Sequence, residues 1–188
     1  MFVTRPDGGI ELRLLEERHT ETVYALMDGN RAYLREWLPW VDSTCSPQDI
    51  ETFIKAGLQL LADNGAFNAG IWLDDVLVGV VSYHRIDWTG GATAIGYWLD
   101  AGHQGRGIMT RAVGQMIDYA FDELQLNRVE IHCAISNARS RSLPERLGCT
   151  EEAVLHQAEW LNDRFVDHVI YAVLAEDWRK TRGRESLP

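Results

Sequence analysis

The segment from Gln104 to Thr110 combines glycines with polar side chains in a pattern that suits phosphate binding. It follows a strand-like run that ends near Leu99 and precedes a helix-like run, so Gly105 and Gly107 lie in a strand-to-helix turn. The first turn of a helix offers N–H groups without intrahelical partners at the positive end of the helix dipole. Glycines let the backbone approach a bulky anion closely, and Thr110 adds a hydroxyl donor. The segment therefore predicts a pyrophosphate site.

A plain glycine-containing turn before a helix would look similar, so the glycines alone leave this prediction open. Other nucleotide-binding motifs do not fit, because the lysine of a P-loop is missing and no GxGxxG opens a repeated βαβ unit. Arginine forks suit phosphate, although ordinary surface charge explains clustered arginines as well. Six arginines lie in this part of the chain: Arg106, Arg111, Arg128, Arg139, Arg141 and Arg146.

A second candidate segment, N-A-R-S-R-S-L-P-E-R-L-G-C, begins at Asn137, a residue that can cap a helix. Together with the glycine turn it resembles the GNAT superfamily of N-acetyltransferases, and within it the RimJ/RimL-like branch. The turn resembles the acetyl-CoA signature (Q/R)-x-x-G-x-(G/A), with Met109 in place of the final small residue. The second segment resembles N-x-x-S-x-x-(V/L)-P-E-(K/R)-L-G-F, with Cys149 in place of phenylalanine.

Two further segments extend the resemblance toward both ends of the chain. The run Leu34–Val41 resembles the acceptor-side loop of the branch, and Ala158–His168 resembles its loop between the last two strands. The four segments follow the family's order and cover the chain from about Ile10 to Trp178. The resemblance implies a GNAT-like acyl-CoA N-acyltransferase fold and acetyl transfer from acetyl-CoA, as co-substrate, to a primary amine.

The resemblance assigns acetyl-CoA binding to the turn and to the strand before it. In the family, backbone N–H groups of the turn hold the CoA pyrophosphate. The preceding strand, here around Tyr97-Trp98-Leu99, splays from its neighbour and pairs with the pantetheine arm. The asparagine that opens the second segment also contacts CoA. The implied cofactor-binding residues are Trp98, Leu99, Gln104, Gly105, Arg106, Gly107, Ile108, Met109, Thr110 and Asn137.

Acetyl transfer requires a neutral amine, because an ammonium group has no lone pair. An α-amino group has a pKa of about 8, so a general base or a water chain must take its proton. Many GNAT enzymes use a tyrosine, seven residues after the asparagine, to protonate the departing thiolate, but Pro144 occupies that position here. The RimL-like branch implies Ser140 as the acid and Glu159 as the base. An ordinary first-turn serine and a solvated loop glutamate are the alternatives.

Three side chains are candidates for the acceptor site. Trp37 and Trp40 belong to the acceptor-side loop, and His84 lies on a strand beside the expected acceptor side. Core packing explains the two tryptophans equally well, and histidines on strands are more often structural or surface residues. The histidines show no ligand spacing and no cysteine pair has CxxC spacing, so no metal is expected.

We expect alternating strands and helices to position these residues. Ser46, Pro47 and Asp49 form a helix-start signal, and Asn64-Gly65 is a stop signal. The expected elements are a strand at Ile10–Leu15, a helical region at Thr20–Glu36 broken near Gly29, a helix after Ser46, a hairpin of Phe67–Leu73 and Val76–Ile86, a strand at Thr93–Leu99, a helix at Gly107–Leu124, a strand at Arg128–Ile135, a helix at Asn137–Leu147, and strands at Thr150–Gln157 and Phe165–Leu174.

This order, βααβββαβαββ, predicts an α/β (α+β mixed sheet) class, with a central mixed, mostly antiparallel sheet flanked by helices. We expect one domain over residues 1–188, with a core at about 10–178 and a polar, mobile tail after Trp178. In the strand at Arg128–Ile135, residues Val129, Ile131, Cys133 and Ile135 should face the core.

Composition narrows the possible partners. The formal net charge of −10 argues against nucleic acid and anionic membranes, and it favours a cationic amine. The three cysteines, Cys45, Cys133 and Cys149, indicate free thiols in a reducing compartment. The first ten residues lack the apolar region of a signal peptide, and no apolar run approaches membrane-span length, so we expect a cytoplasmic protein.

The acceptor is less defined than the reaction. We expect direct attack in a ternary complex, because no cysteine falls in a nucleophile–base pattern. The main expectation is the N-terminal α-amine of a protein, such as a ribosomal protein. The alternatives are a small-molecule amine (polyamine, aminoglycoside or peptide antibiotic) and a non-catalytic acetyl-CoA-binding sensor. Resemblance to RimL-like proteins also suggests a homodimer.

Overall fold

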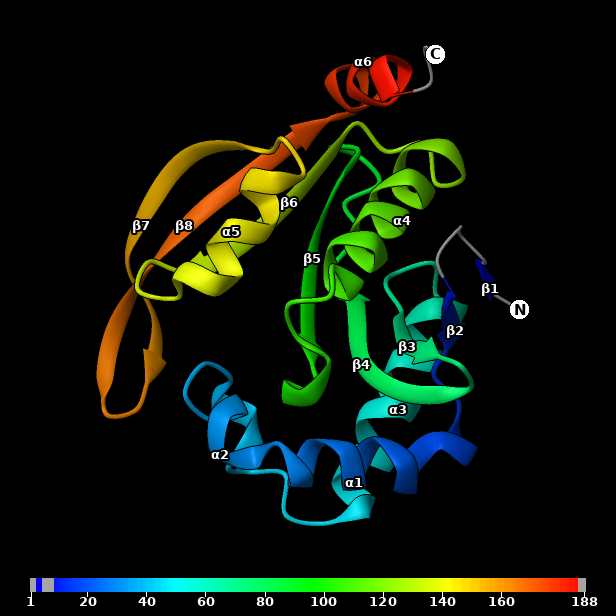
Figure 1. Cartoon of the computed structure of the whole chain (residues 1–188), viewed down its shortest axis with the longest axis vertical. Coiled ribbons are helices and arrows are strands. Elements are labelled where there is room, and N and C mark those ends of the chain that lie inside the picture. Colours follow the sequence, from blue (N-terminus) through cyan, green and yellow to red (C-terminus); the bar gives the residue numbers. More distant parts are fainter. Residues whose placement is uncertain (1–2, 5–8, 186–188) are drawn as a thin grey trace.

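The computed structural model describes residues 3–4 and 9–185, which form an eight-stranded sheet with helices on both faces (Figure 1). The strands lie in the order β1-β2-β3-β4-β5-β6-β8-β7, and only the β5–β6 pair is parallel. The mixed, mostly antiparallel sheet expected from the sequence is therefore confirmed. The strands are β1 (Val3–Thr4), β2 (Ile10–Leu14), β3 (Asn68–Leu73), β4 (Val76–Tyr83), β5 (Ala92–Leu99), β6 (Arg128–Ala134), β7 (Thr150–Leu161) and β8 (Arg164–Leu174).

The helices follow the expected positions, with one addition at the C-terminal end. They are α1 (Thr20–Gly29), α2 (Arg31–Leu34), α3 (Pro47–Ala62), α4 (Ile108–Asp122), α5 (Ala138–Arg146) and α6 (Ala175–Glu185). Three short 3-10 helices join them: η1 (Glu17–His19), η2 (Pro39–Val41) and η3 (Ala101–His103). The helix-start signal before α3 is a capping box, in which Asp49 accepts hydrogen bonds from the backbone N–H and the hydroxyl of Ser46, both at 2.9 Å.

Helices pack on both faces of the sheet because neighbouring strand residues alternate between two buried layers. On one face, α4 buries an apolar stripe that includes Val113, Met116 and Ile117, all fully buried, against strand residues such as Ile71. Trp72, the next residue along β3, instead packs with α1 and α3. The sheet is thus held from both sides by helices.

The parallel pair β5–β6 separates part of the way along its length. The two strands pair at Ala92, Thr93 and Ala94 of β5, which face Arg128, Val129 and Glu130 of β6. Beyond that point β5 continues to pair with β4 as far as Leu99, while β6 continues with β8 as far as Ala134. The splayed strand expected around Tyr97-Trp98-Leu99 is therefore present, and it opens a gap in the sheet.

The C-terminal part differs from the sequence expectation in two ways. The expected loop between the last two strands is a strand pair closed by Asn162 and Asp163, whose φ angles are 51° and 60°. Asn and Asp tolerate this left-handed conformation, so the hairpin turns in two residues and both strands lengthen. The chain after Trp178 was expected to be a mobile tail, but it continues as a helix as far as Glu185. Buried Ala175 and Trp178 anchor this helix, and Trp178 donates a hydrogen bond of 2.7 Å to Asp118 of α4.

One core prediction was wrong. Ile135 was expected to continue the buried face of β6, but its side chain is 44% exposed and the strand ends at Ala134. The Ile135 N–H donates to the carbonyl of Asp167, and the chain then turns into α5. The alternation therefore stops one residue earlier than the apolar pattern suggested.

Candidate active site

A cavity of about 1230 Å³ lies where β5 and β6 part. Its walls come from the α2–η2 segment, from Phe53 of α3, from β3 to β6, from the first turn of α4, from one face of α5, and from β7 and β8. All of the side chains and turn residues predicted for the site line this cavity except Arg106, which is exposed beside it. The fold thus brings together residues that lie far apart in the sequence.

The glycine turn enters α4 through two left-handed residues. The φ angles of Gly105 and Gly107 are 75° and 69°, values that L side chains rarely adopt. Gly107 is the N-cap of α4 and supplies no capping side chain, so the N–H groups of the first turn are not capped by it. These groups and the positive end of the helix dipole point to the same place, which suits an anion.

Two arginines of α5 lie beside this turn, and both belong to the six arginines found in this part of the sequence. Arg139 donates a hydrogen bond to the side chain of Gln104, and Arg146 Nη2 lies 3.4 Å from the Thr110 hydroxyl. Both arginines line the cavity. Their spacing of seven residues puts them on one face of a helix, and this signal was available in the sequence. The turn therefore has cationic side chains across from it.

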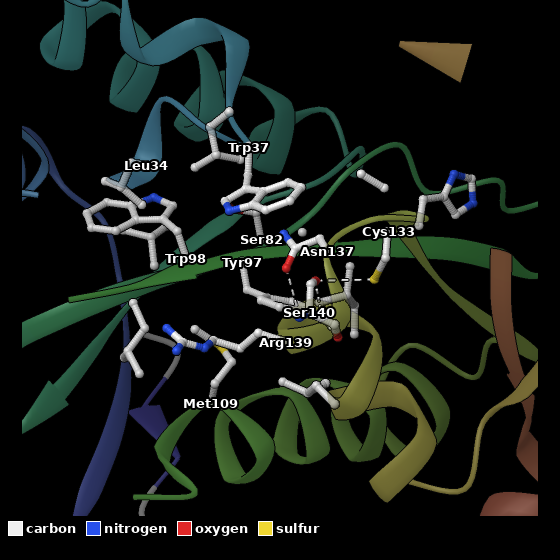
Figure 2. A pocket seen from close by; sticks show the side chains of 18 of the residues that line it. Leu34, Trp37, Ser82, Tyr97, Trp98, Met109, Cys133, Asn137, Arg139 and Ser140 are labelled. Carbon is white, nitrogen blue, oxygen red and sulfur yellow. Dashed lines mark hydrogen bonds between the residues drawn. The ribbon is translucent and has the colours of Figure 1, made fainter. Parts of the chain in front are cut away.

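Ser140 lies at the start of α5 in a small hydrogen-bond network (Figure 2). Asn137 caps the helix, because its Oδ1 accepts from the Ser140 N–H at 3.0 Å. The Ser140 hydroxyl lies 3.2 Å from both the Tyr97 hydroxyl and Cys133 Sγ. Tyr97 also donates to the Ser140 carbonyl at 3.2 Å. Ser140 is therefore held in place by Tyr97, which was expected only as part of the splayed strand, and by Cys133, which was expected only to face the core.

Burial keeps the neighbours of Ser140 protonated. Burial raises the pKa of Tyr97 far above its usual value, and it also raises the pKa of the Cys133 thiol. A thiol with a raised pKa is a poor nucleophile, because the thiolate is the reactive form. The network can hold and pass protons, but it does not supply a covalent nucleophile.

Aromatic side chains of the acceptor-side segment cover the opposite wall. Figure 2 shows Trp37 and Trp98 on one side of the cavity, and Met109 and Arg139 on the other. Trp40 lies against Trp98 with ring centroids 6.5 Å apart and the rings inclined at 55°, while Trp37 packs against the buried cluster of Ala134, Leu161 and Val166. The two tryptophans therefore line the cavity and contribute to packing at once.

His84 lies over Gly96 of β5 at the same wall. A Cβ atom at position 96 would come within 2.5 Å of His84 Nε2, so glycine makes room for the imidazole. Although His84 is open to the cavity, the surrounding wall lowers its pKa by desolvation, and the nearby His132 lowers it further. His84 is therefore neutral at pH 7 and can accept or donate a hydrogen bond there.

Glu159 was predicted to lie in a loop, and this placement was wrong because it lies on β7. Its Oε2 atom is 3.2 Å from Nε2 of His168 on β8, and both residues line the cavity. Sequence reasoning missed His168, since the histidines had been treated as scattered. His168 of β8 pairs with Ala134 of β6, a strand that lines the cavity. This register cannot be read from the sequence, so the position of His168 could not be predicted.

The cavity can therefore place an anionic group at one end and an amine at the other. The first end offers backbone N–H groups of the helix start and the α5 arginines, while the second offers the carboxyl group of Glu159 beside the imidazole of His168. Among residues 3–4 and 9–185, no group of three or more His, Cys, Asp or Glu side chains is placed to hold a metal ion. In the same part of the chain, no helix combines the length and apolar character needed to cross a membrane.

Comparison with known proteins gives consistent matches over most of the chain. Residues 10–150 match the family described as Acetyltransferase (GNAT) domain. The ribosomal-protein-serine acetyltransferase of Escherichia coli (strain K12) is 33% identical over 163 residues, which are 87% of this chain and 91% of that protein.

Two solved structures share the fold in detail. RimL, described as a ribosomal L7/L12 α-N-protein acetyltransferase in complex with CoA, aligns with a TM-score of 0.89 at 27% identity, covering 92% of this chain and 97% of that one. The microcin C7 self-immunity acetyltransferase MccE, in complex with acetyl-CoA and AMP, aligns with a TM-score of 0.86 at 30% identity, covering 89% and 93%.

Proposed function

This chain belongs to the GNAT acetyltransferase family and is an acetyl-CoA-dependent N-acetyltransferase, and we propose that its acceptor is the N-terminal α-amine of a protein. The observation that carries the proposal is the cavity between β5 and β6, which has an anion-binding turn on one side and the Glu159–His168 pair on the other. The relatives described as acting on ribosomal proteins make such a protein the first acceptor to test.

The cofactor side of the cavity fits CoA. We assign the pyrophosphate to the N–H groups of the turn at Gly105–Thr110, and the pantetheine arm to the free edge of β5 at Trp98 and Leu99. Arg139 and Arg146 add charge-assisted donors for the phosphates. An extended arm can pair with β5 because β6 no longer does so beyond Ala94.

The acceptor side must deliver a neutral amine. In the proposal, Glu159 accepts the proton of the bound ammonium, directly or through one water, and the amine then attacks the acetyl carbonyl. The net charge of −10 favours approach of a cationic acceptor. Trp37, Trp40 and His84 form the wall against which the first residues of the acceptor would lie.

Ser140 is the proposed donor to the departing thiolate. In the RimL structure a disulfide joins CoA to a cysteine, so the CoA thiol of that protein reaches a cysteine side chain. Cys133 of this chain lines the cavity 3.2 Å from the Ser140 hydroxyl. A CoA thiol near Cys133 would therefore be within reach of Ser140, whose hydroxyl the Tyr97 hydroxyl holds in place, and water that enters as the products leave would restore the Ser140 proton.

The same geometry supports direct transfer in a ternary complex. The buried thiol of Cys133 has a raised pKa, so it is a weak candidate for an acetylated intermediate. Direct attack needs both substrates in the cavity at once, and the two ends described above provide separate places for them.

A small-molecule amine is the second candidate acceptor. MccE, described as a microcin C7 self-immunity acetyltransferase, shares the fold at 30% identity, so a peptide antibiotic or another small amine is a specific competitor. A non-catalytic acetyl-CoA sensor is a weaker alternative function, because Glu159 and Ser140 both face the cavity.

We further propose a cytoplasmic homodimer. The long edge strand β7, with exposed Val154, Leu155 and Trp160, offers a surface for it, and light scattering of the purified protein tests it.

Acetylation of a matched acceptor panel tests the proposed function. The panel contains a lysine-free peptide with a free N-terminus, the same peptide blocked at its N-terminus and carrying one lysine, and spermidine. Mass spectrometry should find the acetyl group on the α-amine of the first peptide only. Acetylation of spermidine alone would favour the small-molecule alternative, and tight acetyl-CoA binding without any product would favour a sensor.

A further inference from the structure

His168 and Glu159 form a carboxylate–imidazole pair in the acceptor wall. The two side chains are 17% and 30% exposed, and His168 Nε2 lies 3.2 Å from Glu159 Oε2. His168 sits on β8, which is flanked by β6 and β7 through the register partners Ala134 and Leu155. A side chain on a strand paired on both sides has a fixed backbone, and such a position suits precise placement of a partner.

A bulge in β7 brings Glu159 to this position. Leu155 pairs with His168, but the next register partners are Glu159 and Val166, so β7 carries two residues more than β8 in this interval. In an unbulged ladder Gln157 would stand opposite Val166. The bulge instead puts Glu159 there, on the same face as His168, because an insertion of two residues preserves the side-chain alternation.

Asp167 holds the bulge from the other strand. Its Oδ1 accepts a hydrogen bond of 2.8 Å from the Gln157 N–H, and its Oδ2 lies 3.0 Å from His156 Nδ1. Gln157 itself has a φ of 53°, a left-handed conformation that is uncommon for such a residue. The bulge is therefore a fixed feature of the hairpin, and its main effect is the position of Glu159 beside His168.

The other histidine–carboxylate pairs of the described residues differ from this one. His132–Glu130, His156–Asp167 and His103–Asp100 are also within ion-pair distance. In none of the three do both partners line the cavity, whereas both His168 and Glu159 do. If these ion pairs only stabilised the fold, there would be no reason for one complete pair to lie in the cavity wall.

We propose that His168 is a positioning residue for acetyl transfer and acts through Glu159, a proposal that rests on the function proposed above. The Nε2–H of His168 donates to one carboxylate oxygen and leaves the other oxygen directed at the acceptor amine. Without this bond the flexible glutamate would sample several rotamers, and only some of them would reach the amine. A neutral imidazole is sufficient, because a donated N–H fixes the carboxylate without neutralising it.

Two substitutions at position 168 and one matched control test the proposal. His168→Leu removes the donor, and His168→Gln keeps an N–H donor of similar reach. His103→Leu serves as the control, since His103 also pairs with a carboxylate, Asp100, but lies outside both the cavity and the β7–β8 hairpin. With the free-N-terminus peptide, His168→Leu should lower kcat by roughly 10- to 100-fold, and His168→Gln should recover most of it. Calorimetric affinity for acetyl-CoA should stay within about twofold in all three.

A double variant distinguishes a positioning role of His168, exerted through Glu159, from a purely structural role. If His168 acts through Glu159, the double variant His168→Leu/Glu159→Gln should be no slower than Glu159→Gln alone. Losses that multiply in the double variant would overturn the proposal, as would a near-normal kcat in folded His168→Leu. If Glu159→Gln is impaired but His168→Leu is not, this inference fails and the proposed function stands. If the wild-type protein acetylates no α-amine, both fail.

Discussion

The cofactor side and the acceptor side of the cavity are built in different ways. The cofactor side comes from one continuous stretch, in which β5, the turn at Gly105 and Gly107, α4, β6 and α5 follow each other in the chain. The acceptor side comes from segments far apart in sequence: Trp37 and Trp40, then His84, then Glu159 with His168. The tip of the β7–β8 hairpin reaches the first of these segments, where Asn162 donates to the carbonyl of Glu36 at 3.1 Å (Figure 1).

The difference shows which kinds of binding site can be recognised from a short stretch of sequence. A phosphate site made of backbone N–H groups requires glycines at fixed positions, so it leaves a local motif. A site made of side chains from several strands depends on their register, and a register is a tertiary property. The cofactor side should therefore respond to backbone changes, and the acceptor side to changes of individual functional groups.

The largest expected effect is on the cofactor side. Gly107→Glu should reduce acetyl-CoA affinity by more than roughly 100-fold, because it adds bulk and negative charge at a site for phosphate and strains a residue with a φ of 69°. Gly148→Glu is the matched control: Gly148 has a φ of 75°, so the backbone strain is similar, but it lies outside the cavity. Calorimetry should show binding to Gly148→Glu and none to Gly107→Glu. Equal affinities in two folded variants would contradict the assignment of the turn.

The acceptor side should show a large effect on turnover without an effect on acetyl-CoA binding. Glu159→Gln should lower kcat by roughly 10²–10⁴-fold, since the ammonium of the acceptor then loses its proposed base. The loss should shrink as pH rises past about 8, where more of the α-amine is already neutral. Near-full activity of this variant at neutral pH, with a saturating acceptor, would show that the base lies elsewhere.

Ser140 lies where the two sides meet, and its replacement should have an intermediate effect. Ser140→Ala should slow the chemical step by roughly 10- to 100-fold, because the thiolate then leaves without its proposed proton donor. Its pH dependence should be weaker than that of Glu159→Gln, since the proton concerned belongs to the thiol and not to the amine. Single-turnover rates at several pH values check this, and identical pH profiles for the two variants would argue against separate acid and base roles.

The smallest expected effect concerns His84 and the stability of the acceptor wall. The folded protein lowers the pKa of His84 below its ordinary value of about 6.5, so its neutral form is favoured by folding. Stability from this source is present above about pH 6.5 and is lost as pH falls through the lowered pKa. The thermal midpoint of the wild type should therefore fall more steeply between about pH 7 and pH 5 than that of His84→Gln. Parallel curves would indicate that His84 is not desolvated in the wall.

The sequence predicted most of the elements because their signals are local. The capping box at Ser46, the apolar stripe of α4 and the glycine turn each lie within one element or one junction. The two-residue turn at Asn162 and Asp163 was also a local signal, but it was read as part of a longer loop. The helix after Trp178 depends on the burial of that tryptophan against α4, which no local pattern reveals.

Most residues of the candidate site were predicted from the sequence, and the main omission, His168, lies on the acceptor side. Glu159 was identified through the family resemblance, but its partner His168 was not, because the bulge held by Asp167 sets their relative position. On the cofactor side, Arg139 and Arg146 were visible as charges, while their position across from the turn required the packing of α5 beside α4. Their seven-residue spacing is the signal in the sequence that would have placed both arginines on one face of a helix.

Direct transfer between the two sides is the central claim, and a single-turnover experiment tests it most directly. Protein preloaded with acetyl-CoA is mixed with a peptide carrying a free N-terminus, quenched at intervals, and the masses of protein and peptide are followed together. We predict that the acetyl group appears on the peptide α-amine while the protein mass stays unchanged, and that Glu159→Gln slows this step without abolishing acetyl-CoA binding. An acetylated protein that forms and decays at the rate of product formation would contradict the account.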